Sequence, residues 1–296
     1  MNPHTHSMGV TENRTVKMAD RRILIDWVTA TFASGAADVA LEIIGETPVA
    51  SWLWGKPSNG YNRCRVSPFG TRVQWHLGEE RMGTSVVISG KVLSALHDVG
   101  VTGDFLVSAF DGQGARFSRV DVALDVFNDS RVLVNLLNSA NELKGAKKPP
   151  LIISRLNADF NAQFGSRASE RFVRVYNKRV EQKVDFDWLR IEAELKGKRA
   201  VQAQEQISKG GMPAAAAVLK ETVHGAVKSA VDGFFELFEG IQSVDLTMPR
   251  RETETRMWLL KSVVPALARE ISQEDGEAFL ALFWREVNRR TSAESE

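Results

Sequence analysis

Three segments of this chain alternate apolar and polar residues with a period of two, the spacing of a β-strand that buries one face. They are residues 119–127, 172–178 and 189–196. In each segment the apolar positions are mainly valine, leucine or isoleucine, and the polar positions hold arginine together with an acid or a tyrosine. The pattern predicts a sheet with one core face and one strongly charged face.

The rest of the chain predicts elements arranged around this sheet. Residues 23–32 are typical of a buried strand, 72–77 and 85–89 of a strand pair, and 91–99 of a short helix, whereas 48–69 are rich in loop-forming residues. The predicted fold class is α+β, an antiparallel sheet flanked by helices with a helical C-terminal extension. The expected parts are a disordered tail at 1–20, an α+β domain at 21–197 and a helical region at 198–296.

Composition limits the compartment and the kind of site. The chain has a formal net charge of +1 and a single cysteine, Cys64, so neither a disulfide framework nor a thiolate zinc site is expected. No apolar run approaches the roughly 20 residues that a membrane span requires. We therefore expect a cytoplasmic protein with no membrane partner, whose binding surfaces are local patches of charge.

The polar face of the three segments gathers acids, cations and one phenol. Carboxylates are expected from Asp121, Asp125, Glu192 and Glu194. Carboxylate oxygens are the ligands that Mg²⁺ and Mn²⁺ prefer, so these residues are the candidate metal ligands. The alternative is a solvated outer face whose charges pair across strands.

A glycine-containing turn precedes the second segment. In residues 163–171, glycine permits close backbone approach, and four side chains offer donors suited to phosphate: Ser166, Arg167, Ser169 and Arg171. An ordinary polar turn before a strand is the alternative interpretation.

At this turn and the strands around it, a family resemblance becomes visible. The runs FGSRASERFVRVYNKRVEQ and WLRIEAELKGK, with FSRVDVALDVF and IDWVTATF upstream, resemble the replication initiation factors of rolling-circle plasmids, filamentous phages and integrative elements. The likeness spans roughly residues 22 to 270. It implies a protein that nicks one DNA strand at an origin by Mg²⁺- or Mn²⁺-dependent tyrosine transesterification and stays joined to the 5′ end.

The resemblance also implies roles for individual residues. Tyr176, in the family's Arg-x-Tyr-x-Lys element, is the candidate nucleophile, and Lys178 is its catalytic neighbour. We expect Lys178 and Arg174 to lower the pKa of the phenol. The candidate DNA contacts are Arg119, Ser166, Arg167, Ser169, Arg171, Arg174, Arg190 and Lys198. Further basic clusters lie at 144–148 and 249–251.

One departure from the family leaves alternatives open. Many relatives carry tyrosine where this chain has Phe164, and its two tyrosines are Tyr61 and Tyr176. Tyr61 is the reserve nucleophile. If the nucleophile belongs at Phe164, the protein binds origin DNA without cutting it. A metal-dependent nuclease that activates water is a further alternative.

The motifs that the sequence lacks bear on the partners. There is no G-x-x-x-x-G-K-[ST] phosphate loop, so ATP hydrolysis is not expected and a separate host helicase would unwind the DNA. The expected partners are origin DNA, single-stranded or supercoiled, a host helicase and a second copy in a homodimer.

Overall fold

The computed structural model describes residues 21–33, 36–46, 49–129, 151–155, 159–227, 234–244, 246, 263–273 and 276–293. These fall into two compact units, residues 1–246 and 247–296. The N-terminal tail and the basic clusters at 144–148 and 249–251 lie outside the described residues.

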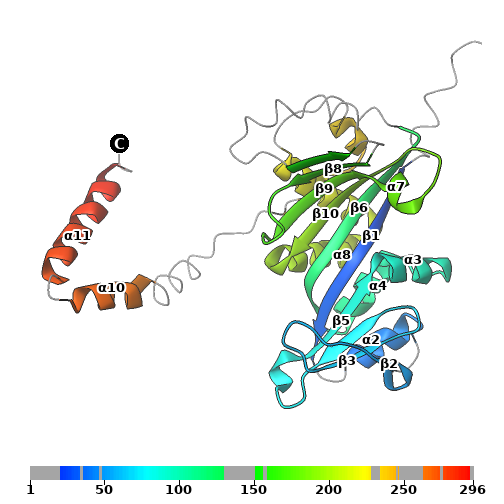
Figure 1. The fold of residues 1–296 in the computed structure, drawn as a ribbon, viewed down its shortest axis with the longest axis horizontal. Coiled ribbons are helices and arrows are strands. Elements are labelled where there is room, and N and C mark those ends of the chain that lie inside the picture. Colours follow the sequence, from blue (N-terminus) through cyan, green and yellow to red (C-terminus); the bar gives the residue numbers. More distant parts are fainter. Residues whose placement is uncertain are drawn as a thin grey trace, which may run out of the picture. The chain divides into compact units, whose positions relative to one another are not determined.

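A ten-stranded sheet dominates the first unit (Figure 1), in the order β2-β3-β4-β5-β1-β6-β10-β9-β8-β7. All its pairings are antiparallel. The strands are β1 Arg21–Phe32, β2 Leu53–Trp54, β3 Arg63–Val66, β4 Arg72–Trp75, β5 Thr84–Ser89, β6 Arg116–Phe127, β7 Leu151–Arg155, β8 Asp159–Phe164, β9 Arg171–Asn177 and β10 Trp188–Lys196. The first strand of the chain therefore lies in the middle of the sheet.

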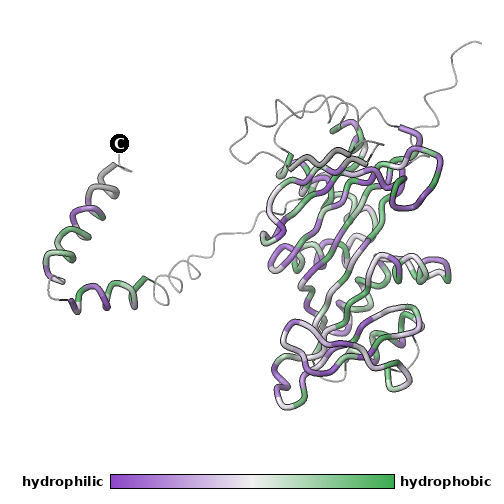
Figure 2. The backbone as a smooth tube through the Cα atoms, in the orientation of Figure 1, coloured by the Kyte–Doolittle hydropathy of each residue, from purple (hydrophilic) through white to green (hydrophobic). Residues whose placement is uncertain are grey.

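Helices flank this sheet, and the longest of them packs on its apolar face. The described helices of the first unit are α2 Ala36–Ile43, α3 Gly90–Asp98, α4 Gly103–Gly112, α7 Lys178–Gln182 and α8 Gly197–Ala226, with short 3-10 turns at Val49–Ser51, Glu80–Met82 and Phe235–Phe238. Helix α8 packs on β6, β10 and β9, and α4 packs on α8. Hydrophobic and hydrophilic residues are interspersed along the strands, as one-sided burial requires (Figure 2).

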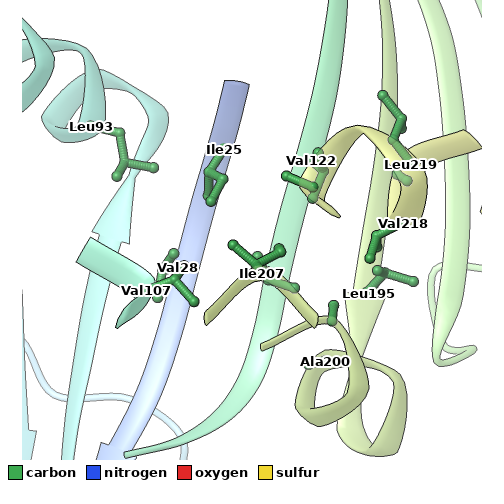
Figure 3. Close-up of a cluster of buried hydrophobic side chains, with 14 of the residues drawn as sticks. Ile25, Val28, Leu93, Val107, Val122, Leu195, Ala200, Ile207, Val218 and Leu219 are labelled. Atoms are coloured by element: carbon green, nitrogen blue, oxygen red, sulfur yellow. The ribbon is translucent and has the colours of Figure 1, made fainter. Parts of the chain in front are cut away.

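The core forms between the sheet and α8 (Figure 3). Val122 of β6 and Leu195 of β10 are fully buried, and Ile207 and Leu219 of α8 lie against them. Valine and isoleucine suit such a pleated, buried surface because their branched side chains pack well there. Helix α8 changes direction at Gly211, whose φ of 63° and ψ of −151° favour glycine.

The second unit contributes two described helices, α10 Val264–Ile271 and α11 Gly276–Ala293. None of the helices in the described part of the chain is both long and apolar enough to cross a membrane.

The predicted α+β class, with its antiparallel sheet, flanking helices and helical C-terminal region, is confirmed. The three alternating segments are β6, β9 and β10. Because α8 begins at Gly197 and packs on the sheet, the first unit extends past the point where the sequence becomes helical.

Candidate active site

The strand register aligns the polar residues of four central strands in rows across one face of the sheet. Antiparallel neighbours that face each other project to the same side. One row runs from β1 to β9 through Arg22, Asp125, Arg190 and Tyr176, the next holds Glu192 beside Arg174, and the third holds Asp121 beside Glu194. The sequence-predicted carboxylates and the phenol therefore share one face of one sheet.

Asp125 lies between two arginines. Arg190 donates from Nε to Asp125 Oδ1 at 2.6 Å and from Nη2 to Oδ2 at 2.9 Å, and Arg22 Nη2 donates to Oδ2 at 2.7 Å. Burial alone would raise the pKa of Asp125, but these bonds and the charge of Arg190 lower it below its ordinary value. Asp125 is therefore an ionised, fully paired buried carboxylate.

A β-bulge adds a second acid beside Arg190. The β1–β6 register shifts between Ile25 and Trp27, and this irregularity falls at Asp26. The Asp26 Oδ1 oxygen accepts a hydrogen bond from Arg190 Nη1 at 2.7 Å. A Cβ atom at Gly90 would lie 2.6 Å from that oxygen, so glycine allows α3 to begin directly against the carboxylate.

Arg119 joins two further carboxylates. Its Nε donates to Asp121 Oδ1 at 2.8 Å, and its Nη2 lies 2.8 Å from Glu194 Oε2. Burial raises the pKa of Asp121 to about 7, because the opposing effect of Arg119 is too small to offset it and Glu192 and Glu194 add negative charge nearby. The region around Asp121 is thus crowded with negative charge.

Tyr176 lies beside the buried carboxylate of Glu192. The phenolic hydroxyl donates to Glu192 Oε2 at 3.2 Å, and Arg174 binds the other carboxylate oxygen. Burial and the charge of Glu192 raise the pKa of Tyr176 above its ordinary value, although Arg190 acts in the opposite direction. The expectation that cations lower the pKa of this phenol is therefore wrong.

Lys178 stands next to the phenol but is engaged elsewhere. Strand β9 ends at Asn177, whose side chain caps α7, so Lys178 is the first residue of a short helix. Its Nζ lies 2.8 Å from Glu181 Oε1 and 5.7 Å from the centroid of the Tyr176 ring. The lysine is therefore near the ring while its closest charged partner is Glu181.

The polar face forms the floor of a cavity of about 1090 Å³. Residues of β1, β6, β8, β9 and β10 line the cavity, as do residues of α3 and α7. Among them are Tyr176, Glu192, Arg174, Asn161 and Lys91. Within the described residues, Arg174 Nε and Asn161 Oδ1 are buried atoms with no hydrogen-bond partner. Both residues line the cavity, so its wall contains a donor and an acceptor that the described protein groups leave unsatisfied.

The predicted phosphate-binding turn lies elsewhere on the sheet. Arg171 pairs with Leu195 and Tyr176 with Arg190, so the two are five residues apart along β9, about 17 Å at strand spacing. Ser169 Oγ donates to the backbone oxygens of Ser166 and Arg171. The structure therefore does not bring this turn together with the tyrosine.

The cations of the turn differ in accessibility. Arg167 is exposed and stacks over Phe172, at 5.3 Å from Cζ to the ring centroid, and Lys198 is exposed at the start of α8. Arg171 is half-buried, close to Gly225 of α8, and burial together with the charge of Arg199 lowers its pKa. Arg167 and Lys198 remain accessible to a DNA phosphate, whereas Arg171 packs against the fold.

The two other candidates for the nucleophile position lie off this face. Phe164 is buried in the hydrophobic core and faces Val173, on the side of the sheet that α8 covers. The hydroxyl of Tyr61 donates to the backbone oxygen of Met82 at 3.2 Å. Of the two tyrosines in the chain, only Tyr176 lines the cavity.

The carboxylates have the right chemistry for a hard divalent cation, but their surroundings do not fit one. Each of the four predicted ligands is bound by an arginine or a lysine: Asp121 and Glu194 by Arg119, Glu194 also by Lys196, Glu192 by Arg174, and Asp125 by Arg22 and Arg190. Across the described ranges, no three acidic, histidine or cysteine side chains are grouped as metal ligands. The structure contains the pairing of charges across strands that the alternative expects, but the carboxylates are buried and do not form a solvated outer face.

Two contributors to this face were missed by sequence reasoning. Arg22 and Asp26 both come from β1, whose apolar run predicts only a buried strand. A single acid inside an apolar strand is a usable signal, since an isolated charge there requires a partner. The partner itself depends on the bulge and on the register, which no local pattern contains.

Comparisons with known proteins give a family from one match and a similar fold from another. The family model described as replication initiation factor matches residues 115–280. Among solved structures, the rolling circle replication initiator protein from Geobacillus stearothermophilus is similar with a TM-score of 0.55 and 20% identity, over 78% of this chain and 90% of that one. A comparison with curated proteins finds no match.

Proposed function

Because this chain belongs to the replication initiation factor family, we propose that it nicks one DNA strand at a replication origin with Tyr176 as nucleophile. The observation that carries the proposal is the hydrogen bond from Tyr176 to the buried carboxylate of Glu192, 3.2 Å long, at the floor of a large cavity. An activated nucleophile and an adjacent proton acceptor are the usual parts of covalent catalysis.

The proposed step transfers a phosphoryl group from DNA to protein. Tyr176 Oη attacks the scissile phosphorus while its proton passes to Glu192 Oε2, the phosphorus–O3′ bond breaks, and a 5′-phosphotyrosyl link forms. A proton acceptor is needed because the raised pKa keeps the phenol neutral before attack. The departing O3′ leaves as a free 3′ hydroxyl after taking a proton from solvent.

The cations of the floor supply the electrostatic part of the proposal. A phosphate entering the cavity carries negative charge, and the guanidinium of Arg174, whose side chain is 24% exposed, lines the cavity. Hydrogen bonds from a guanidinium to phosphate are strong and directional, so Arg174 would orient the scissile group and stabilise its growing charge. Arg190 and Arg119 hold the surrounding carboxylates in place.

A divalent ion has no step in this proposal. The described carboxylates are engaged by cations, so an ion would have to displace Arg119 or Arg174 from Asp121, Glu192 or Glu194. The dependence on Mg²⁺ or Mn²⁺ that the family resemblance implies remains a prediction. A host helicase and a homodimer likewise remain part of the proposal, as partners of an initiator that has no phosphate loop of its own.

The proposal is tested by trapping the covalent product. A linear single strand of DNA that carries the origin is labelled at either its 3′ or its 5′ end, incubated with protein and Mn²⁺, and run on a denaturing gel. A 5′-phosphotyrosyl link retains only the 3′ label on the protein. We expect the labelled band with wild type and with the control Tyr61→Phe, and its loss with Tyr176→Phe.

Other outcomes of the same experiment distinguish the alternatives. A band that survives in Tyr176→Phe but not in Tyr61→Phe would move the nucleophile to Tyr61. Nicking without any band in every variant would indicate a nuclease that uses water. Binding with neither nicking nor a band would indicate an initiator that only recognises its origin.

A further inference from the structure

The chain concentrates positive charge in a segment that the proposed reaction does not use. Residues 47 to 78 contain Lys56, Arg63, Arg65 and Arg72 but no aspartate or glutamate, although the whole chain carries a net charge of only +1. No carboxylate among the described residues forms an ion pair with these four cations. The cations on the cavity floor, by contrast, are bound by acids.

Two of these arginines share a face with two tryptophans at the edge of the sheet. Trp54 of β2 faces Arg65 of β3, and Arg63, two residues along, faces Trp75 of β4. Arg65 Cζ lies 4.3 Å above the ring of Trp54, and the rings of Trp54 and Trp75 are 6.0 Å apart. We call these four residues the Arg–Trp face.

The Arg–Trp face is held in a fixed arrangement. Arg65 donates to the backbone oxygens of Val49 at 3.3 Å and Trp52 at 3.2 Å, and to that of Ala50. These bonds orient the guanidinium without neutralising its charge. The ring of Trp54, with Arg65 on one side, is 64% exposed to solvent. The oriented guanidinium of Arg65 can therefore bind an anion, and the exposed ring of Trp54 can stack against a flat ring.

The Arg–Trp face lies on the other side of the sheet from Tyr176. Arg65 projects to the same side as its neighbour Val73, which belongs to the hydrophobic core, whereas Tyr176 projects to the side of the cavity. DNA that contacts this face is consequently a segment remote from the scissile phosphate.

We propose that the Arg–Trp face binds an unpaired DNA strand, with a base stacked on Trp54 and adjacent phosphates on Arg63 and Arg65. Cations interleaved with exposed aromatic rings suit single strands, because stacking requires a base that is not already inside a duplex. The inference rests on the proposed function, since strand nicking at an origin releases such a strand.

The experiment measures binding without cleavage. A fluorescent single strand of about 16 nucleotides, the upper end of a typical site for such surfaces, and the matching duplex are titrated by anisotropy in EDTA. All proteins carry Tyr176→Phe so that no covalent link forms. Trp54→Ala is compared with Trp54→Phe, and Phe105→Ala on α4 is the control for loss of an exposed aromatic residue.

We expect Trp54→Ala to weaken single-strand binding by about 5- to 100-fold, the usual loss for one stacked base. Trp54→Phe and Phe105→Ala should remain near the parent, and duplex binding should change little. Arg63→Ala, at a solvent-exposed side chain, should lower the slope of log affinity against log salt by about 0.7. The matched charge control is Lys209→Ala, which is exposed on α8.

Two results would overturn the inference. One is single-strand binding by Trp54→Ala equal to that of the parent, when thermal unfolding shows both to be folded. The other is an equal loss of single-strand and duplex affinity, which would indicate general charge attraction. Because these titrations need no cleavage, they can succeed even if the wild-type protein forms no covalent adduct, and the two proposals fail separately.

Discussion

Tyr176 donates its hydrogen bond to one oxygen of Glu192 while Arg174 binds the other oxygen, so phenol, carboxylate and guanidinium form one chain of contacts. Register produces this chain: Glu192 faces Arg174, and Tyr176 lies two residues further along the same strand. The carboxylate is almost completely buried, which keeps its two partners in a fixed relation. The predictions below follow from such charge-coupled contacts.

Replacing the proposed proton acceptor should slow the reaction while leaving the fold intact. Glu192→Gln keeps an oxygen that accepts the Tyr176 hydrogen bond but cannot take its proton at neutral pH. We expect adduct formation to slow by about 100-fold or more, a typical effect of losing general-base assistance. The control is Glu194→Gln, the same change on the same strand face, and equal rates in the two variants would remove Glu192 from this role.

The stability of the protein should decrease as pH rises through the range in which Asp121 ionises. Its pKa is raised to about 7 in the folded protein from an ordinary value of 3.8, so the folded state binds the proton more tightly than the unfolded state. The stabilisation that this proton provides is fully present below the pKa of Asp121 in the unfolded state. It is lost as pH rises through the pKa of Asp121 in the folded state. Its upper limit is on the order of 4 kcal/mol.

Asp121→Asn should therefore flatten the dependence of the unfolding midpoint on pH between about 4 and 7. The lowered pKa of Asp125 acts in the opposite sense and only at more acidic pH, so it does not overlap with this window. The measurement is urea unfolding at several pH values, with the exposed Glu205→Gln as control. A wild-type profile retained in Asp121→Asn would contradict the assignment.

Removing the buried charge of Asp125 should cost more stability than removing its exposed partner Arg22. Asp125→Asn removes the charge that Arg190 binds while Arg190 stays buried, and breaking such a pair costs about 3 kcal/mol or more. Arg22→Ala removes a partner whose side chain is 53% exposed, and we expect a loss of about 1 kcal/mol or less. Chemical denaturation at neutral pH measures the free energy of unfolding of both variants. Similar losses in Asp125→Asn and Arg22→Ala would mean that burial does not determine the cost of breaking these ion pairs.

If cations and metal ions compete for the same carboxylates, removing a cation should strengthen metal binding. Arg174→Gln leaves the buried Glu192 without its guanidinium, so Mn²⁺ should bind this variant more tightly than wild type, with a difference visible by calorimetry. Arg179→Gln, which loosens an exposed pair with Asp187, is the matched control. Unchanged Mn²⁺ affinity in Arg174→Gln would place any metal site away from Glu192.

The sequence alone predicts the faces of the central strands well and their partners poorly. Alternation in the segment around Asp121 and Asp125 is a local property, so the side to which each residue projects follows from the sequence. Which arginine meets which carboxylate depends on the register between distant strands, and Asp26 joins the site only through a bulge. The sequence does not predict the Arg–Trp face either. Residues 48–69 have a loop-like composition, although they contain β2 and β3.

The central position of β1 has a consequence for how the protein can be divided. The family match begins at residue 115, but β6 pairs along its length with β1, which carries Arg22 and Asp26. In a fragment that begins at residue 115, β6 would become a long edge strand without its β1 partner. Exposed edge strands of this kind promote aggregation. Such a fragment would also leave Arg190 with one carboxylate fewer. A fragment designed to retain the site around Arg190 should therefore keep the first strand.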